Sequence, residues 1–380
     1  MASFVYDDLK TKYGHFTYPV SVVKIGGKDF ADNKADLAIS DVEVELSSGF
    51  EASIATFWIY NCYDQVACQF QFDDIKSYIY MGSSVAIGLG YGSTAREVFR
   101  GFISGVRFVY PRTGVPGVEV TAMDVKGIMM SGSYSKQLTA TSYSGAVKEI
   151  LQKTAYTKMK SSDIITSLDI ADTPDASSLG SSSKDERTIE MVCESDYEFV
   201  VKAAKKFNYE FFTVGGVVYF RKAKSNTEVL IELGPGDGLR SFEVGYDITG
   251  LVESVEVRGM DAGKSSAITK TQKLQNTISK GSKAKSLLSK TEKVYIDPTI
   301  ASATEVGYRA AYLAEDISYR LGTLEAETVG IPELTPGRFV KIRNLGTAAS
   351  NTFYVVNVRH IMDSERGYLT RITGKAASIQ

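Results

Sequence analysis

Histidine and cysteine are scarce in this chain of 380 residues, which contains two histidines and three cysteines. His15 and His360 lie far apart, and Cys62, Cys68 and Cys193 are odd in number and form no Cys-x-x-Cys pair. A zinc site or a disulfide framework normally needs such residues at short, repeated spacings. The sequence therefore argues against both, and we expect the three cysteines to be reduced thiols in the core.

Long hydrophobic runs are also missing. No stretch approaches the roughly 20 consecutive apolar residues that span a bilayer. Asp7 and Asp8 stand where a signal peptide would have basic and then apolar residues, so we expect synthesis in a cytoplasm. The formal net charge is only −2, so no overall field draws the chain to nucleic acid or to an anionic membrane. We therefore expect no stable nucleic-acid binding.

The motifs of common catalytic sites are absent from the sequence. It has no Gly-x-Ser-x-Gly elbow and no His-Glu-x-x-His helix. The run Gly234–Gly238 lacks the Lys-Ser/Thr of a phosphate-binding loop and predicts a tight turn instead. The 45 Asp and Glu residues leave many possible carboxylate pairs, but sequence spacing identifies none of them as a glycosidase pair. We predict a protein that is not an enzyme and that uses no metal and no cofactor.

Short alternating runs of apolar and polar residues are abundant, as are tyrosine (22) and phenylalanine (18). In Val42–Leu46, three apolar residues face one side and two glutamates face the other, which is the pattern of a half-buried strand. Clusters of Gly, Asn and Pro between such runs indicate turns. Further strands are predicted at Ile54–Tyr60, Val85–Tyr91, Val98–Tyr110, Val118–Met123, Val217–Arg221, Val252–Arg258, Phe339–Arg343, Phe353–Ile361 and Tyr368–Thr373.

Three segments have helical spacing instead. Ser195–Glu198 and Ser302–Glu305 each place a serine three residues before a glutamate, which is the pattern of a capping box at a helix start. After the second box, apolar residues recur every three or four positions as far as Leu321, and Gly322 follows where a left-handed stop residue belongs. A shorter helix is predicted near Tyr143–Tyr156.

Two stretches lack periodicity. Thr173–Lys184 contains a proline and a run of serines and predicts a loop or linker. Gly259–Lys293 is rich in lysine, with eight lysines against one aspartate and one glutamate. This stretch could be an arm that binds an anion or docks a partner. We favour the alternative, a solvated mobile insertion between strands.

One pattern occurs twice in the chain. The first copy begins with a glycine turn and an alternating strand at Gly82–Ile87. A long strand containing Val106-Arg107 follows, and a second glycine turn with a final strand ends the copy at Gly117–Thr121. Gly337–Ile342, Val358-Arg359 and Gly367–Thr370 repeat this order. Repetition of this kind predicts two copies of one antiparallel β unit, although two unrelated hairpin pairs would give the same turn chemistry.

The segment Thr188–Phe207, followed by Gly215–Phe220, resembles a signature of the phage late control protein D family. In that signature a strand ending in Glu-Ser-Asp leads into an aromatic-led helix with paired small residues, and a short hairpin follows. The usual glutamine at the start of the motif is not evident, and Phe207-Asn208 stands where the family often has a glycine. The matching residues are Glu194, Ser195, Asp196, Phe199, Ala203 and Ala204.

A second match lies near the end of the chain. Gly330–Gly337, Phe353–His360 and Gly367–Thr370 resemble the family's glycine-proline approach to a barrel strand, its strand ending in histidine and its closing Gly-Tyr-x-Thr strand. In this setting His360 is expected to be a satisfied strand residue rather than a catalytic one. The matching residues are Gly330, Pro332, Pro336, Gly337, Tyr354, His360, Gly367, Tyr368 and Thr370.

The resemblance implies a β-rich α+β fold with two tail-tube-like antiparallel β-barrel units and an α/β middle region, assembling as a trimeric ring. The expected domains are a first barrel at 1–135, an α/β domain with short helices and a hairpin at 136–228, and a second barrel at 229–380. The second barrel would carry the lysine-rich insertion at 259–293 and the helix at 302–321. Three chains would then present six similar units.

The family contains baseplate hubs of contractile phage tails and the hub portion of type VI secretion spike proteins. The resemblance implies a structural hub, made in a bacterial cytoplasm, that joins the sixfold tail tube to the trimeric spike of a virion tail or a phage-tail-like particle. The implied partners are two further copies of the chain, a tail tube protein, a separate spike protein, other baseplate proteins and a tape-measure protein. Membrane contact would come only through the assembled machine.

Several alternatives remain open at this point. A phage tail, a bacteriocin-like particle and an extracellular injection system would share these motifs. The tyrosine content also fits a secreted β-rich adhesin or carbohydrate-binding module, but no signal peptide is evident. A cell-wall hydrolase of the tail would need a catalytic domain for which no residues remain. Too few residues follow Tyr368–Thr373 for a folded spike, so we expect the spike to be a separate polypeptide.

Overall fold

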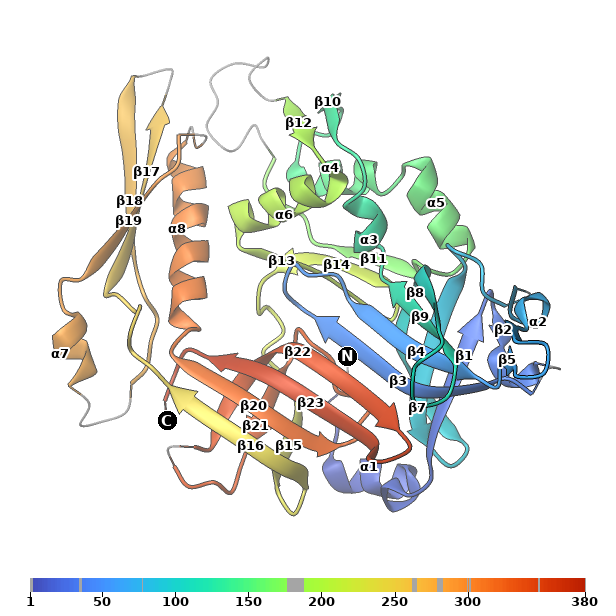
Figure 1. Ribbon diagram of the computed structural model, residues 1–380. Coiled ribbons are helices and arrows are strands. Elements are labelled where there is room, and N and C mark those ends of the chain that lie inside the picture. Colours follow the sequence, from blue (N-terminus) through green and yellow to red (C-terminus); the bar gives the residue numbers. More distant parts are fainter. Residues whose placement is uncertain are drawn as a thin grey trace.

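In the computed structural model, the residues described are 3–33, 36–76, 78–175, 188–261, 265–278, 283–298, 300, 302–347 and 349–379. Strands make up most of the regular structure, and helices gather above and beside them (Figure 1). Their apolar side chains form three separate buried clusters. The predicted β-rich α+β fold is confirmed.

The first β unit has six strands in the order β1-β7-β8-β9-β4-β3, all antiparallel to their neighbours. The alternation in Val42–Leu46 is confirmed, because Val42, Val44 and Leu46 are fully buried. The strands are β1 (Pro19–Ile25), β3 (Ala38–Ser47), β4 (Ile54–Tyr60), β7 (Ser84–Tyr91), β8 (Thr94–Val109) and β9 (Gly117–Met123). Shorter elements around them are α1 (Tyr6–Lys12), η1 (Gly14–Phe16), β2 (Lys28–Asp29), η2 (Phe30–Asp32), β5 (Tyr63–Asp64), β6 (Gln69–Phe70) and α2 (Phe72–Lys76).

The second β unit is a closed six-strand barrel in the order β15-β21-β22-β23-β20-β16, in which β16 pairs back to β15. The strands are β15 (Val229–Pro235), β16 (Gly238–Tyr246), β20 (Gly322–Val329), β21 (Phe339–Ile342), β22 (Asn351–Asp363) and β23 (Gly367–Ala376). The run Gly234–Gly238 forms the tight turn between β15 and β16, with Asp237 N–H donating to Gly234 O at 2.8 Å. Gly236 and Gly238 have φ of +88° and +82°, so the predicted turn is confirmed and its glycines are needed there.

The two units repeat the same strand order. Matched one to one, β1, β7, β8, β9, β4 and β3 correspond to β15, β21, β22, β23, β20 and β16. Both copies of the repeated sequence pattern are three-stranded antiparallel meanders, β7-β8-β9 and β21-β22-β23. The first strand differs, because β1 runs antiparallel to β7 whereas β15 runs parallel to β21. The repeat seen in the sequence is therefore a repeat of topology.

The two units share one continuous sheet through the antiparallel pair β3–β22. Along one edge, β22 pairs first with β21 and then with β3, while β23 occupies its other edge. Val44 lies opposite His360, and Glu43 forms an ion pair with Arg359 at 2.6 Å. The junction is thus a strand-to-strand contact with its own ion pair.

The α/β middle region follows the first β unit in the chain and lies above it (Figure 1). The predicted helix near Tyr143–Tyr156 is two helices, because the chain turns at 151–153 so that Leu151 and Tyr156 both reach the same core. The elements are α3 (Lys126–Met129), β10 (Tyr134–Leu138), α4 (Tyr143–Ile150), α5 (Thr154–Ser161), β11 (Ser167–Ile170), β12 (Ile189–Glu194), α6 (Asp196–Phe207), β13 (Tyr209–Val214) and β14 (Val217–Lys222). Of the predicted loop Thr173–Lys184, only 173–175 lie within the described residues.

A separate three-stranded sheet, β18-β17-β19, stands to one side with a long helix along one face (Figure 1). It consists of β17 (Ser254–Asp261), β18 (Ser266–Lys273) and β19 (Glu292–Ile296), with α7 (Ala284–Leu288) and α8 (Ala303–Ser318). The lysine-rich stretch is therefore not a loose insertion where it is described. Its Ile268 and Leu288 pack on the core below α8, and its lysines mask the strand alternation in the sequence.

Two further expectations need correction. The helix after Ser302 ends at Ser318, with Tyr319 at φ −76° as its cap, and Gly322 starts β20 instead of stopping the helix. All three cysteines are free, but only Cys62 is buried. Alternation with the buried Met191 would turn Cys193 inward, but the strand is irregular here: Cys193 has φ +50° and is exposed, and the pairing of β12 with β10 shifts register.

Candidate functional site

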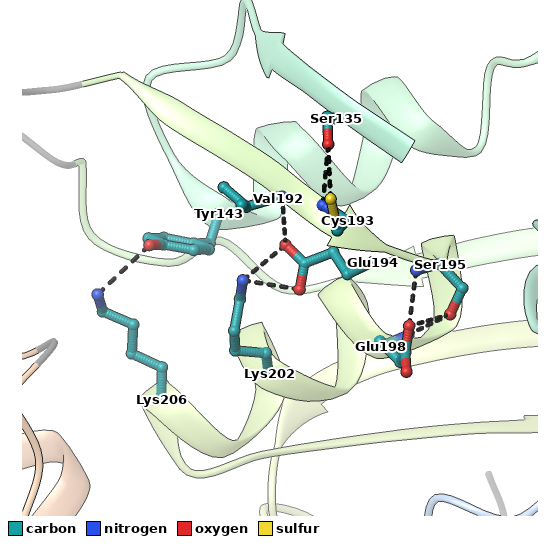
Figure 2. Close-up of polar contacts among 9 residues, drawn as sticks. All are labelled: Ser135, Tyr143, Val192, Cys193, Glu194, Ser195, Glu198, Lys202 and Lys206. Carbon is teal, nitrogen blue, oxygen red and sulfur yellow. Dashed lines mark hydrogen bonds and ion pairs between the residues drawn. The ribbon is translucent and has the colours of Figure 1, made fainter. Parts of the chain in front are cut away.

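The Glu-Ser-Asp motif lies at the junction of β12 and α6 (Figure 2). Ser195 accepts a hydrogen bond from Glu198 N–H at 3.2 Å, and the Glu198 carboxylate accepts one from Ser195 N–H at 2.7 Å. The predicted capping box is confirmed. These hydrogen bonds to Ser195 lower the pKa of Glu198. The box fixes the direction in which α6 leaves the strand.

The two acids on either side of Ser195 anchor α6. Glu194, at the end of β12, accepts two hydrogen bonds from Lys202 in the second turn of α6, at 2.6 and 2.7 Å (Figure 2). Asp196 is buried and accepts hydrogen bonds from Lys153 and from the Tyr156 hydroxyl, the latter at 2.6 Å. Burial first, and then this contact with Asp196, raise the pKa of Tyr156. A buried acid with two donors ties α6 to α5.

The remaining residues of the first motif form packed core. Phe199, Ala203 and Ala204 have no exposed surface and belong to the middle cluster. Lys206 at the end of α6 pairs with Glu305 of α8 at 2.6 Å. Asn208 caps α6 at φ 58° and ψ 46°, the left-handed conformation that a glycine adopts readily and that asparagine tolerates. The asparagine therefore fills the place where the family often has a glycine.

The second motif surrounds the loop between β20 and β21. A Cβ atom on Gly330 would meet the Tyr368 ring at 2.1 Å, and one on Gly337 would meet Phe212 at 2.6 Å. Gly330 N–H donates to Tyr368 O at 2.9 Å, and Gly337 N–H donates to Val355 O at 2.9 Å. Pro332 and Pro336 are buried between these two contacts. The glycines and prolines thus allow the loop to lie against the barrel wall.

His360 locks this loop to the hairpin of β22 and β23. Its Nε2 lies 3.3 Å from Leu334 O, and because a carbonyl only accepts, Nε2 carries the proton. The Tyr368 hydroxyl donates to Nδ1 at 2.9 Å, and Thr370 Oγ1 lies 3.1 Å from the same atom. Burial lowers the pKa of His360 to about 4. The imidazole is therefore neutral near pH 7 and serves as a buried connector, for which Gly367, at φ +69°, makes the tight turn.

Tyr354 connects the second barrel to the middle region. Its hydroxyl donates to the buried Glu210 carboxylate, which also pairs with Arg221 at 2.7 Å. Arg221 in turn donates to Gly337 O at 3.1 Å. Burial, followed by the charge of Glu210, raises the pKa of Tyr354 well above its usual range. This network joins the second motif to β13 and β14.

The two motifs therefore do not converge on one reactive cavity. Each holds a junction between elements, and the histidine is enclosed and uncharged. Within the described ranges, no three His, Cys, Asp or Glu side chains are grouped so as to hold a metal ion. No helix in the described part of the chain is long and apolar enough to cross a membrane. The polar contacts of both motifs connect elements within the chain.

Sequence reasoning missed a second buried connection, between Asp124 and Lys126. Lys126 is fully buried and donates to Glu51 O at 2.7 Å, while Asp124 accepts from Ser53 N–H at 3.0 Å. Burial lowers the pKa of Lys126 and raises that of Asp124. Both follow directly after β9, so in the sequence they resemble ordinary polar turn residues. No spacing signal distinguishes them.

Large apolar side chains are exposed on strands of both β units. On and just after β8, Phe108 is 43% exposed and Tyr110 is 67% exposed, and on β16 Phe242 is 44% exposed. Phe108 contacts Phe70, and Tyr110 contacts Tyr63, each with ring centroids 5.1 Å apart. Exposed aromatic groups of this kind mark candidate interaction surfaces.

In sequence, the chain matches the family model described as the Alg8 N-terminal domain over residues 63–364. This is not the late control protein D family that the two motifs resemble. No curated protein matches the chain.

Solved structures share the fold across almost the whole chain. The tail protein from Neisseria meningitidis MC58 is 13% identical with a TM-score of 0.66, covering 94% of this chain and 97% of that one. The 43 kDa tail protein of prophage MuSo2 from Shewanella oneidensis is 12% identical with a TM-score of 0.67, covering 94% and 98%. The Escherichia coli c3393 protein, a component of the type VI secretion system, is 10% identical with a TM-score of 0.55, covering 93% and 76%. The fold is that of phage tail proteins.

Proposed function

The chain belongs to the family described as the Alg8 N-terminal domain, and from this premise we propose that it is a structural baseplate hub of a contractile phage-like tail or injection system. The hub would adapt a sixfold tail tube to a trimeric spike. The fold shared with phage tail proteins and with a type VI secretion component supports this role. The two motifs support kinship with the late control protein D family, which is part of the proposal.

One observation carries the proposal: a single chain contains two β units of the same strand order, already joined edge to edge. Head-to-tail contacts between identical chains generate a ring when the rotation closes. Three chains with two units each would present six similar units toward a tube and a threefold arrangement toward a spike. A doubled unit therefore gives a physical route from one symmetry to the other.

The proposal has consequences for activity and partners. The histidine of the second motif holds a loop and is enclosed, which supports a structural rather than a catalytic role. We propose that the partners are two further copies, a tail tube protein, a separate spike protein, other baseplate proteins and a tape-measure protein. The proposed domains are 1–135, 136–228 and 229–380. As part of a virion tail or tail-like particle, the protein would reach a membrane only through the assembled machine.

Light scattering after size-exclusion chromatography tests this proposal. At micromolar concentration we expect a particle of three times the 41.5 kDa chain mass. Addition of the spike protein should leave this stoichiometry at three hub chains. A particle of one chain over the whole concentration range, with and without the spike protein, would contradict the proposed hub.

A further inference from the structure

Resting on the proposed hub function, we infer that neighbouring subunits join by antiparallel pairing of β16 of one chain with residues 104–109 of β8 in the next. This contact would repeat between chains the β3–β22 pairing that joins the two units within one chain. The partner is therefore a second copy of this chain, held in a defined register.

The strand ladders fix which residues of the two units correspond. Val106 lies opposite Val120 in β9, as Val358 lies opposite Ile372 in β23. Following the ladders through β4 and β20 places Glu243 of β16 at the position of Glu43 in β3. The sequences agree with this register, since Val42–Leu46 reads Val-Glu-Val-Glu-Leu and 242–246 reads Phe-Glu-Val-Gly-Tyr.

In a single chain, the corresponding strands of the two units differ in how many of their edges are paired. The second half of β22 has β23 on one edge and β3 on the other. The corresponding half of β8 has β9 on one edge, and among the described residues no strand pairs with 104–109 along the other. Likewise β16 pairs with β20 on one edge, and on the other it meets β15 only at Gly238 and Leu239. Free sheet edges of this kind readily pair with another chain.

Exposure of the side chains agrees with this assignment. In the junction within the chain, Val42, Val44 and His360 are each at most 1% exposed. If two chains pair in the register of β3 and β22, Phe108 lies opposite Val244 and Tyr110 lies opposite Phe242. Three of these four are large apolar residues that are at least 43% exposed in one chain. Pairing would remove this apolar surface from water.

The charges agree as well. Within the chain, Arg359 pairs with Glu43, which lies diagonally across the β3–β22 ladder. The equivalent residues are Arg107 and Glu243, one on each free edge. In one chain Arg107 contacts Glu119, and no ion pair to Glu243 occurs among the described residues. The proposed contact supplies Glu243 with a cation.

This contact also gives the ring a simple construction. The sheet runs β8-β9-β4-β3-β22-β23-β20-β16 within one chain, and β16 would lead on to β8 of the next. In Figure 1, β16 lies at the lower left and β8 to the right of centre, so the two ends of this series are apart in one chain, as a head-to-tail ring requires. Three chains would close one barrel in which every ring strand has two neighbours, and closure removes the free edges.

A charge exchange tests the inference. Arg107→Glu or Glu243→Arg places like charges across the proposed contact, and each should raise the concentration for half-assembly at least about tenfold. The double variant should restore assembly, which a merely misfolded variant would not do. Arg320→Glu is the matched control and should assemble normally, because Arg320 lies just beyond the end of α8, half exposed, in an ion pair with Asp316.

Cysteine cross-linking tests the register. With Cys68 and Cys193 replaced by serine, Phe108→Cys combined with Val244→Cys should give covalently linked chains on oxidation. Phe108→Cys combined with Gly245→Cys is the control, because a shift of one residue points the thiol to the other face. A trimer that does not cross-link at 108 and 244 and ignores the charge changes would overturn this interface while leaving the hub intact. A wild-type monomer would overturn both proposals.

Discussion

The role of His360 follows from its surroundings rather than from its residue type. A lone histidine in a strand could serve as a base, a ligand or a connector. Its contacts with Leu334 O and the Tyr368 hydroxyl use both ring nitrogens, which leaves none for a substrate. The predicted structural role is therefore the one that the geometry supports.

The depressed pKa of His360 predicts a pH-dependent stability. The unfolded chain protonates this histidine near pH 6.5, whereas the folded chain keeps it neutral down to about pH 4. The unfolded state thus binds more protons between these values, so stability is lost as the pH falls from 6.5 to 4. The loss should be roughly 3 kcal/mol. Urea unfolding of the wild type and of His360→Asn measures it: the variant should lose this part of the slope, and equal slopes would contradict the assignment.

Gly330 and Gly307 predict opposite outcomes for the same substitution. Gly330→Ala forces a Cβ into the Tyr368 ring, so we expect a loss of about 2 kcal/mol or more in the free energy of unfolding. Gly307 lies inside α8 with nothing within 4 Å of its missing Cβ. Gly307→Ala should therefore raise stability by up to about 1 kcal/mol. Denaturant unfolding of both variants provides the check, and a harmless Gly330→Ala would refute the close contact.

At the scale of elements, the strands with a clear apolar pattern could be predicted. Strands in which polar or exposed residues hide that pattern could not. All ten predicted strands are present, because each is a short apolar or alternating run bounded by turn residues. β18 was missed because threonines and lysines fill its outer face and only Ile268 reports its buried side. β16 was missed for a related reason, because Phe242 and its neighbours are exposed in a single chain. Alternation therefore gives a weak signal in a strand whose apolar side chains are not covered within the chain.

The same applies to the candidate site. The capping box at Ser195 could be predicted because it depends on residues three apart in sequence. In the network of Glu210, Arg221 and Tyr354, by contrast, Tyr354 lies more than a hundred positions from the other two residues in the sequence. No local pattern contains such a contact, so it becomes visible only when β13 and β22 are brought together.

Deletion of the lysine-rich stretch tests the revised view of the sheet β18-β17-β19. Replacing residues 262–293 by a short Gly-Ser linker removes β18 and the start of β19, and exposes Val255 and Val257, which are fully buried below α8. A solvated loop would be lost at little cost. We expect instead a clear fall in melting temperature, measured by circular dichroism, because the apolar face of α8 loses its cover. An unchanged melting temperature would restore the sequence-based interpretation.

At the scale of the whole molecule, the central feature is the doubling of one β unit. Six strands in one order occur twice, and a strand pair joins the copies into one sheet. A unit that already pairs with its own copy has the contact needed to pair with another chain. Pseudo-symmetry within the chain and symmetry between chains would then share one interface.

Electron microscopy of the purified protein tests this account most directly. Class averages viewed along the axis should show a ring of three chains with six similar lobes around a central opening. Separate particles of one chain, or rings built from a number of chains other than three, would contradict it.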